Sequence, residues 1–391
     1  MGRVLSGLHL AAKRGPFAAA LYVELPLIVA AFYVWSIAKG RDWVMQDFMA
    51  VRGGAHDVIR GISPYPPADP VAIAHATHLV YPPLIAYLFL PFAVLPYAMS
   101  AALYLCVCLA AVAGSVCLLG VRDWRCYGVT FLWFPVVAAL PVGAIGPLLM
   151  LLLALIWRYR DRVLVLAPLV AITVTLKLFL WPVAIWLIAT RRWRAVALAA
   201  PLTAAAFFLP FLPLGIGVAR SYVSVLRVLN DVFGPISFSS HALLRAFGSS
   251  GAVAGAVVAV MAVVLSAWIC RLARRHERDR LALSAAVLAA LLLSPIVWVH
   301  YYGLLLIPIA LARPRLSGLW FAPMLFWSTH ALESNGDLWR LLTAIAIVTA
   351  VAISSTGPGD EGAGWRRALD PLARRKDLVP APVVARRSSM P

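Results

Sequence analysis

The sequence predicts an all-α, polytopic membrane protein. Of its 391 residues, 63% are hydrophobic and only 13% are charged, whereas soluble domains are about 45–50% apolar and about 25% charged. Apolar runs of roughly 20 residues, each long enough to cross a hydrocarbon core of about 30 Å, recur along the whole chain. A transmembrane β-barrel would show short segments of alternating hydrophobicity instead.

We expect about twelve transmembrane helices in a single domain over residues 1–354, followed by a disordered basic tail at 355–391 that is rich in Gly, Pro and Arg. Several spans are short, which predicts that some are tilted, broken or re-entrant. The predicted spans are 16–38, 97–119, 126–140, 143–157, 163–176, 178–190, 195–213, 251–270, 281–298, 301–312, 316–332 and 337–354.

The net charge of +18 is divided among short basic connections between apolar runs, which is typical of membrane topology signals and excludes a nucleic-acid-binding surface. One side of the membrane, with both termini, carries 25 of the 34 Lys and Arg residues. The positive-inside rule therefore predicts a plasma-membrane protein with both termini in the cytoplasm. The basic connections are "RDWR" (122–125), "RYRDR" (158–162), "TRRWR" (190–194), "RLARRHERDR" (271–280) and "ARPR" (312–315).

No segment of the sequence requires a metal or a nucleotide. The five cysteines lie in or beside spans without metal-ligand spacing, and we assign no disulfide to them. There is no phosphate-binding loop, no dinucleotide fingerprint and no carboxylate pair for a nucleotide sugar. We therefore expect no metal and no cofactor, and the N-terminal apolar run predicts a retained signal anchor because it lacks a cleavage site.

The predicted outer side holds two long loops, 39–96 and 214–250, together with acidic and histidine residues that include Glu333. In the first loop, apolar residues recur at three- and four-residue steps over 44–62, which predicts an amphipathic helix at the membrane surface, with an interruption at Gly53-Gly54 left open. Asp47 lies near its start. The carboxylate could accept a proton from a sugar hydroxyl, or it could simply favour the positive end of the helix dipole.

Two further segments place polar groups beside apolar runs. Lys177 in "TVTLKLFLWP" could bind a phosphate or could extend its ammonium group to the interface, and both interpretations stay open. "SPIVWVHYYG" (294–303) combines a helix-disrupting proline with an aromatic group, which the bilayer interface favours, and with a histidine that the interface does not explain. His300 could bind a phosphate oxygen or pair with an acid such as Asp47.

The second loop predicts a surface helix with Tyr222 and three aliphatic residues at helical spacing. Arg245 and two other arginines could face an anionic headgroup, although ordinary solvated charge explains at least one of them. Ser240 and His241 could bond sugar hydroxyls. In "PVGAIGPLLMLLLALIW" (141–157), the glycines at 143 and 146 favour close helix packing over contact with a ligand.

The order of these segments resembles one family. An Asp after the first span is followed by "GISPY", "YPPLIAYLFLPFAVLP", a Lys before "FLWPVAIWLIATRRWRA", "SFSSHALLRAFG" and "LLLSPIVWVHYYGLLLIP". This pattern, over about residues 20–310, is similar to the bacterial polyprenol-phosphate-mannose-dependent α-1,2-mannosyltransferases of the GT-C superfamily. The resemblance implies a multispan GT-C fold with exoplasmic loop helices and an active site that opens to the periplasm.

The resemblance also implies roles for individual residues. Asp47 would be the general base, and His300 would assist proton handling or bind phosphate. From the residues themselves, we assign donor phosphate binding to Lys177, Arg245 and Tyr301. We assign acceptor or sugar binding to Ser240, His241 and Tyr65, and also to Trp298, which lies in the segment that the resemblance covers. Ser240-His241 stands where many members of the family have Asn-Gln.

The expected function is transfer of a sugar, mannose in the first instance, from a polyprenyl phosphate to a lipid-linked or envelope glycan, with inversion. The expected partners are membrane lipids, the lipid-linked donor and a glycolipid acceptor. Donors carrying glucose or arabinofuranose are the alternatives within this class. A lipid or solute transporter that uses Glu24, an acid within the first predicted span, is the alternative from another class, and a non-catalytic membrane scaffold is a third.

Overall fold

The computed structural model describes residues 20–39, 44–75, 79–275 and 278–356, and every regular element among them is a helix. The all-α prediction is confirmed. The start of the expected signal anchor, Arg41, His78 and the tail from 357 onward lie outside the described residues.

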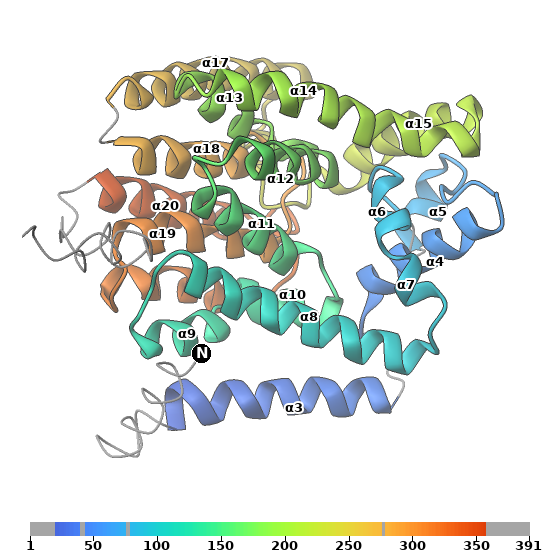
Figure 1. Ribbon diagram of the computed structural model, residues 1–391, viewed down its shortest axis with the longest axis horizontal. Coiled ribbons are helices and arrows are strands. Elements are labelled where there is room, and N and C mark those ends of the chain that lie inside the picture. The colour runs from blue at the N-terminus through green and yellow to red at the C-terminus, as the bar shows by residue number, and fades with distance from the viewer. Residues whose placement is uncertain (1–19, 40–43, 76–78, 276–277, 357–391) are drawn as a thin grey trace, which may run out of the picture. The chain divides into compact units, whose positions relative to one another are not determined.

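The long helices lie side by side as a bundle (Figure 1). Four described helices are long and apolar enough to cross a membrane, and α9 with α10, bent by 64°, would make a fifth. The remaining predicted spans correspond to shorter helices. Four or five spans are therefore supported by length and composition, and the total of twelve stays a prediction. The bundle elements are η1 (Ala20–Glu24), α3 (Leu25–Ala38), α8 (Tyr97–Leu118), α9 (Trp124–Leu132), α10 (Phe134–Val142), α11 (Gly146–Arg158), α12 (Val163–Leu176), η2 (Leu178–Leu180), α13 (Pro182–Ala189), α14 (Trp193–Phe208), η3 (Leu209–Leu214), α17 (Gly251–Ala273), α18 (Asp279–Leu293), η5 (Val299–Leu305), α19 (Leu306–Ala312), η6 (Gly318–Ser328) and α20 (Leu338–Thr356).

The outer surface of the bundle is suited to lipid. On α17 the side chains of Val260 and Val263 are 64% and 71% exposed. A helix with an uncovered aliphatic face would aggregate in water, whereas in a bilayer the acyl chains cover it. Together with the apolar spans, this surface defines a multi-pass membrane protein.

Three interruptions of the helices bring backbone turns to the interior. Trp133 is extended between α9 and α10, two residues before Pro135, which has no N–H to donate to the carbonyl four residues earlier and therefore does not continue α9. Lys177 is extended between α12 and η2. The third interruption follows Ser294, where Pro295 ends α18 and the chain continues to η5. Two of these three interruptions carry residues singled out in the sequence.

Helices from the two long loops lie at one end of the bundle (Figure 1). The helix predicted over 44–62 is present, but the interruption left open at Gly53-Gly54 does not occur, because α4 continues through both glycines. At Gly54 an added Cβ would lie 2.9 Å from a Leu79 methyl, so close packing explains this glycine. The elements at this end are α4 (Gln46–Ile59), α5 (Pro70–His75), α6 (Leu84–Leu88), α7 (Leu90–Ala93), α15 (Ile216–Phe233) and α16 (Ser240–Ala246).

The basic connections contact one another away from those loop helices. Arg192 pairs with both Asp161 and Asp279, which joins three of the five connections. Asp123 accepts a hydrogen bond from the Leu316 backbone N–H, which joins the "RDWR" segment to the residue after "ARPR". This grouping agrees with the predicted division of charge between two sides. The side that faces the cytoplasm stays a prediction.

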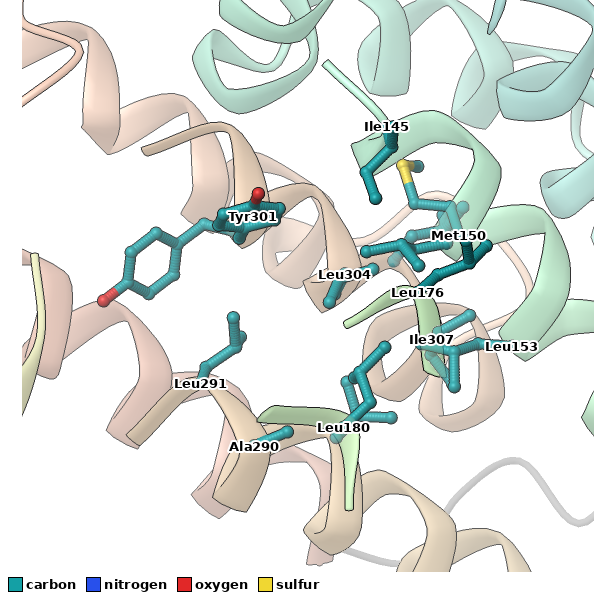
Figure 2. Close-up of a cluster of buried hydrophobic side chains, with 14 of the residues drawn as sticks. Ile145, Met150, Leu153, Leu176, Leu180, Ala290, Leu291, Tyr301, Leu304 and Ile307 are labelled. Atoms are coloured by element: carbon teal, nitrogen blue, oxygen red, sulfur yellow. The ribbon is translucent and has the colours of Figure 1, made fainter. Parts of the chain in front are cut away.

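Figure 2 shows a cluster of buried hydrophobic side chains to which α11, α12, η2, α18, η5 and α19 contribute. Leu176 and Leu180, on either side of Lys177, belong to this cluster and are at most 5% exposed. Tyr301 and Leu304 join it from η5. The backbone at Lys177 and His300 is therefore anchored by close-packed neighbours.

Candidate functional site

A cavity of about 670 Å³ lies between the loop helices and the broken spans, within the size range of about 300–1,000 Å³ typical of small-molecule sites. Its polar wall includes Asp47, Lys177, His300 and Tyr301. Another part of its wall is one face of α15, from Tyr222 to Phe233. The cavity thus combines charged groups with an extended apolar surface. The aliphatic residues that α15 contributes are Val225, Leu226 and Leu229.

Asp47 is held at the first turn of α4 by close backbone packing. The Met45 backbone N–H donates to the Pro141 carbonyl at 2.5 Å. Gly143 has φ +69°, and an added Cβ there would lie 2.8 Å from Phe48 Cβ and 2.9 Å from Met45 Sδ. The packing interpretation of this glycine is therefore confirmed, because it lets the chain approach on both sides of Asp47. The fully buried Phe48 ring fixes the helix further by stacking on Tyr104 at 4.9 Å between centroids.

The Asp47 carboxyl binds its proton more tightly than an ordinary aspartate does. Burial raises the pKa of its carboxyl from 3.8 to about 6, while the Lys177 ammonium opposes this shift. Within the described part of the chain, no hydrogen bond or ion pair of its carboxylate is found. A carboxylate with a pKa near neutrality and free oxygens is suited to accept a proton.

Lys177 stands between two tyrosine rings. Its Nζ lies 4.1 Å from the ring centroid of Tyr81 and 4.7 Å from that of Tyr301. Burial lowers the pKa of Lys177 to about 7, and the Asp47 carboxylate opposes this change. The aromatic faces partly replace the lost hydration of the ammonium group. Among the described residues that line the cavity, Lys177 is the single Lys or Arg.

Trp298 lines the cavity from the residue before η5, and His300 lines it from the first turn of η5. The His300 ring is buried and lies 4.4 Å from the Tyr301 ring, and its Nε2 has no hydrogen-bond partner within the residues described. Trp298 packs edge-to-face on Phe233 of α15 at 5.3 Å. The structure therefore brings five sequence-predicted residues to one cavity. They are Asp47, Lys177, Trp298, His300 and Tyr301.

The other four predicted residues do not line this cavity. Tyr65 is buried behind its wall, where its hydroxyl donates to the Tyr81 carbonyl at 2.8 Å. Ser240, His241 and Arg245 belong to α16, whose N-cap Ser239 accepts a bond from the Ala242 N–H. Arg245 is exposed and donates to the Ser249 carbonyl at 3.0 Å.

The cavity also contains polar residues that the sequence did not single out as a site. Asn230 and Glu333 line it, as do Gln46 and Tyr81. The helical spacing of the aliphatic residues on α15 indicated a face that includes Asn230. Glu333 appeared in the sequence only as one of several acids on the predicted outer side, and no local pattern distinguishes it.

Among the described residues, no group of three or more His, Cys, Asp or Glu side chains is arranged to hold a metal ion. The expectation that no metal is needed stays a prediction. Glu24, on which the transporter alternative depends, is exposed at the end of η1 and does not line the cavity.

Taken together, the fold and the cavity define a multi-pass membrane protein with a partly enclosed charged site. A model of glycosyltransferase family 87 matches residues 79–295, more than half of the chain. The chain therefore belongs to this family, and the prediction of a membrane glycosyltransferase is confirmed. The match begins after Asp47 and ends before His300, so the roles of those two residues depend on geometry.

One curated relative is 28% identical over 310 residues, which cover 73% of this chain and 68% of the relative. It is the polyprenol-phosphate-mannose-dependent alpha-(1-2)-phosphatidylinositol pentamannoside mannosyltransferase of Mycobacterium tuberculosis (strain CDC 1551 / Oshkosh). No solved structure matches the chain.

Proposed function

We propose that this protein transfers a hexose, mannose in the first instance, from a polyprenyl phosphate to a hydroxyl of a lipid-linked or envelope glycan. The observation that supports this proposal best is the cavity itself. In this member of a glycosyltransferase family, a carboxylate and an ammonium group line the same cavity, and neither forms an ion pair within 4.0 Å among the described residues. The name of the mycobacterial relative suggests the donor and the sugar.

The charged groups suit the two ends of a glycosyl transfer. The acceptor oxygen attacks the anomeric carbon from the face opposite the phosphate, and its proton passes to Asp47. The bond between the anomeric carbon and the phosphate oxygen breaks, and its electron pair leaves with the polyprenyl phosphate. Lys177 stabilises the charge that develops on this phosphate. The sugar is transferred with inversion.

His300 and Tyr301 are positioned to assist the phosphate. The Nε2 of His300 has no hydrogen-bond partner among the described residues, so it gives this ring a hydrogen-bonding position for a phosphate oxygen. Tyr301 holds the Lys177 ammonium group against its ring, which restricts the position of the charge. No step in this scheme uses a metal, because positioning and fixed charge are sufficient for a phosphate leaving group.

The apolar wall of the cavity is suited to the lipid part of the donor. On α15, Val225, Leu226 and Leu229 face the cavity, while Arg220 and Asp231 are exposed. An isoprenoid chain that lies along this face would keep its phosphate within the same cavity as Lys177. Donors carrying glucose or arabinofuranose would use the same wall, so the sugar must be determined by experiment.

The direct test uses purified protein in lipid nanodiscs with polyprenyl-phosphate [¹⁴C]mannose and a membrane lipid extract as acceptor. We expect radiolabel in a glycolipid product, and greater transfer from this donor than from the matching glucose or arabinofuranose donors. Absence of transfer from all three donors would contradict the proposed function, and preference for another donor would replace mannose.

The periplasmic position of the cavity is tested by cysteine labelling. In a background without the five native cysteines, Asp231→Cys on the exposed face of α15 and Arg191→Cys between α13 and α14 would each be treated with an impermeant maleimide on intact cells. We expect labelling of the first variant alone, with the second labelled after permeabilisation. The reverse result would contradict the proposed orientation.

A further inference from the structure

Glu333 is an acid at the cavity to which the proposed mechanism gives no role. It belongs to the connection between η6 and α20, beyond the region that the family model matches. The side chain is half-buried, and burial raises the pKa of its carboxyl. In the described structure, its carboxylate makes neither a hydrogen bond nor an ion pair, so its oxygens are available to a ligand.

The backbone on both sides of Glu333 is fixed by hydrogen bonds. The Leu332 carbonyl accepts from the Val299 N–H at 3.3 Å, next to His300. The Ser334 N–H donates to the Ile236 carbonyl at 2.7 Å. The Ser334 hydroxyl also lies 2.7 Å from the Ser237 carbonyl, to which it donates. These bonds attach the segment to η5 on one side and to the α15–α16 connection on the other, so the carboxylate is presented by a restrained backbone.

Asn230 supplies a second uncommitted polar group to the cavity. It lies on the cavity face of α15, and its Oδ1 is buried without a hydrogen-bond partner among the described residues. A buried amide oxygen without a partner is unfavourable, by about 1–3 kcal/mol in mutational data, unless a ligand or water satisfies it. Trp298, which packs on Phe233 of the same helix, adds an aromatic surface.

These three residues have the chemistry of a site for an uncharged sugar. Carboxylate oxygens accept hydrogen bonds from hydroxyls, an amide both donates and accepts, and an indole ring packs against the C–H face of a pyranose. A donor phosphate is directed elsewhere, because Lys177 attracts it and the Glu333 carboxylate repels it. The acceptor glycan is therefore the ligand whose charge fits.

We propose that Glu333 and Asn230 form the acceptor subsite and select an uncharged, hydroxyl-rich sugar over one that carries a carboxylate or phosphate. This inference rests on the proposed transferase function. Glu333 binds a hydroxyl on the sugar that receives the new residue and does not take part in proton transfer. Specificity arises from repulsion of the wrong acceptor as well as attraction of the right one.

The test compares two synthetic acceptors, an octyl hexopyranoside and the matching octyl hexopyranosiduronate, with the wild type and Glu333→Gln, at a fixed concentration of polyprenyl-phosphate mannose. For the wild type we expect transfer to the neutral acceptor and at least tenfold lower kcat/KM for the uronate. Glu333→Gln should raise KM for the neutral acceptor by about ten- to a hundredfold, the range expected for charge-assisted hydrogen bonds. It should also reduce the discrimination against the uronate.

The matched control is Asp231→Asn. This substitution also removes one carboxylate, but Asp231, which follows Asn230 in the sequence, lies on the exposed side of α15. Its acceptor KM should stay within twofold of the wild type. Donor binding to each variant, measured as the increase in Tm on adding polyprenyl-phosphate mannose, reports whether the variant folds and should be unchanged for Glu333→Gln.

The outcomes separate the two proposals. If the wild type transfers sugar but Glu333→Gln keeps both its acceptor KM and its discrimination, the acceptor subsite is wrong and the transferase proposal stands. Equal use of both acceptors by the wild type would also reject the subsite. If the wild type transfers nothing to any acceptor, the proposed function fails first. If polyprenyl-phosphate mannose does not raise the Tm of Glu333→Gln, that variant is replaced by Glu333→Asp. For Glu333→Asp we expect a smaller rise in acceptor KM, with the discrimination against the uronate retained.

Discussion

Asp47 and Asp279 are two carboxylates in contrasting surroundings. Asp279 accepts from the Trp186 indole N–H at 2.8 Å, receives a bidentate pair from Arg192 at 2.8 and 3.1 Å, and lies 3.4 Å from Arg160 Nε. Asp47 lines a cavity, and within the described chain it has a nearby charge in Lys177 but neither an ion pair nor a hydrogen bond.

The contrast separates charge that holds helices together from charge that is available for chemistry. The Asp279 group ties α18 to the chain before α14 and to the connection after α11, and its oxygens are occupied. Among the described residues, the Asp47 oxygens make no hydrogen bond or ion pair, and burial raises the pKa of this carboxyl. Groups of the second kind are concentrated at functional sites.

The largest effect that we expect is a loss of sugar transfer when Asp47, but not Asp279, is substituted. Asp47→Asn keeps the shape of the side chain but removes the proton acceptor, so the transfer rate should fall by about 100- to 10,000-fold, the contribution typical of general base catalysis. The measurement is kcat with polyprenyl-phosphate mannose and a glycolipid acceptor.

The Tm of Asp47→Asn at pH 8 should equal or exceed that of the wild type, because the substitution removes a buried ionised group. Transfer at the wild-type rate by a folded Asp47→Asn variant would exclude Asp47 as the base.

The second prediction concerns stability. Asp279→Asn leaves Arg192 and Arg160 without their shared counter-charge, and breaking such a buried pair reduces the free energy of unfolding by about 3–5 kcal/mol. We expect about 3 kcal/mol, the lower limit, because the Asp279 and Arg192 side chains are 12% and 15% exposed.

Denaturant titration in mixed micelles measures the stability of Asp279→Asn, and kcat per folded molecule should be within a few-fold of the wild type. A large loss of kcat without a loss of stability would remove the distinction between the two carboxylates.

The third prediction sharpens the comparison through pH. Asp47 must be ionised to accept a proton, and its pKa of about 6 lies well above the usual 3.8. Transfer should therefore fall tenfold per pH unit below about pH 6. Because the folded carboxyl binds its proton more tightly than the unfolded one, its contribution to stability is greatest below about pH 4 and is lost as pH rises through about 6.

Activity and the Asp47 contribution to stability should thus change in opposite directions between pH 4 and 6. A pH–rate profile of kcat/KM, with Asp279→Asn as the control that should keep the same acid limb, measures this prediction. An acid limb near pH 4 would mean that Asp47 is not held in its buried state during catalysis.

The sequence predicted the parts of this site that have local signals. A lysine between two apolar runs and a histidine after a proline are conspicuous, and both line the cavity. The position of Asp47 near the start of a helix was also predicted from the spacing of apolar residues, and α4 begins at Gln46. The distribution of Lys and Arg along the sequence assigned the basic connections and the loop helices to opposite sides of the membrane. That assignment needs only the composition of each connecting segment.

The sequence did not predict features that depend on which segments meet. Glu333 lines the same cavity as Asp47 although 286 positions separate them, and hydrogen bonds to Val299 and Ile236 hold its segment. The number of spans stays a prediction for a related reason. Hydropathy counts each apolar run as a crossing, whereas proline and extended residues at Trp133 and Lys177 divide the runs into shorter helices.

The smallest expected effect tests whether residues behind the cavity wall affect the charged groups. Tyr65→Phe removes the hydroxyl that donates to the Tyr81 carbonyl, a bond with a net contribution of about 0.5–1.5 kcal/mol. The Tyr81 ring is one of the two that hold the Lys177 ammonium group, so a looser ring should weaken binding of the donor phosphate. We expect a two- to tenfold rise in donor KM with kcat nearly unchanged.

Tyr87→Phe, which removes a hydroxyl bonded to the Pro210 carbonyl outside the cavity, is the matched control and should leave donor KM unaltered. Equal effects of the two substitutions would show that loss of a tyrosine hydroxyl acts through general stability, and Tyr65 would then have no specific connection to the phosphate.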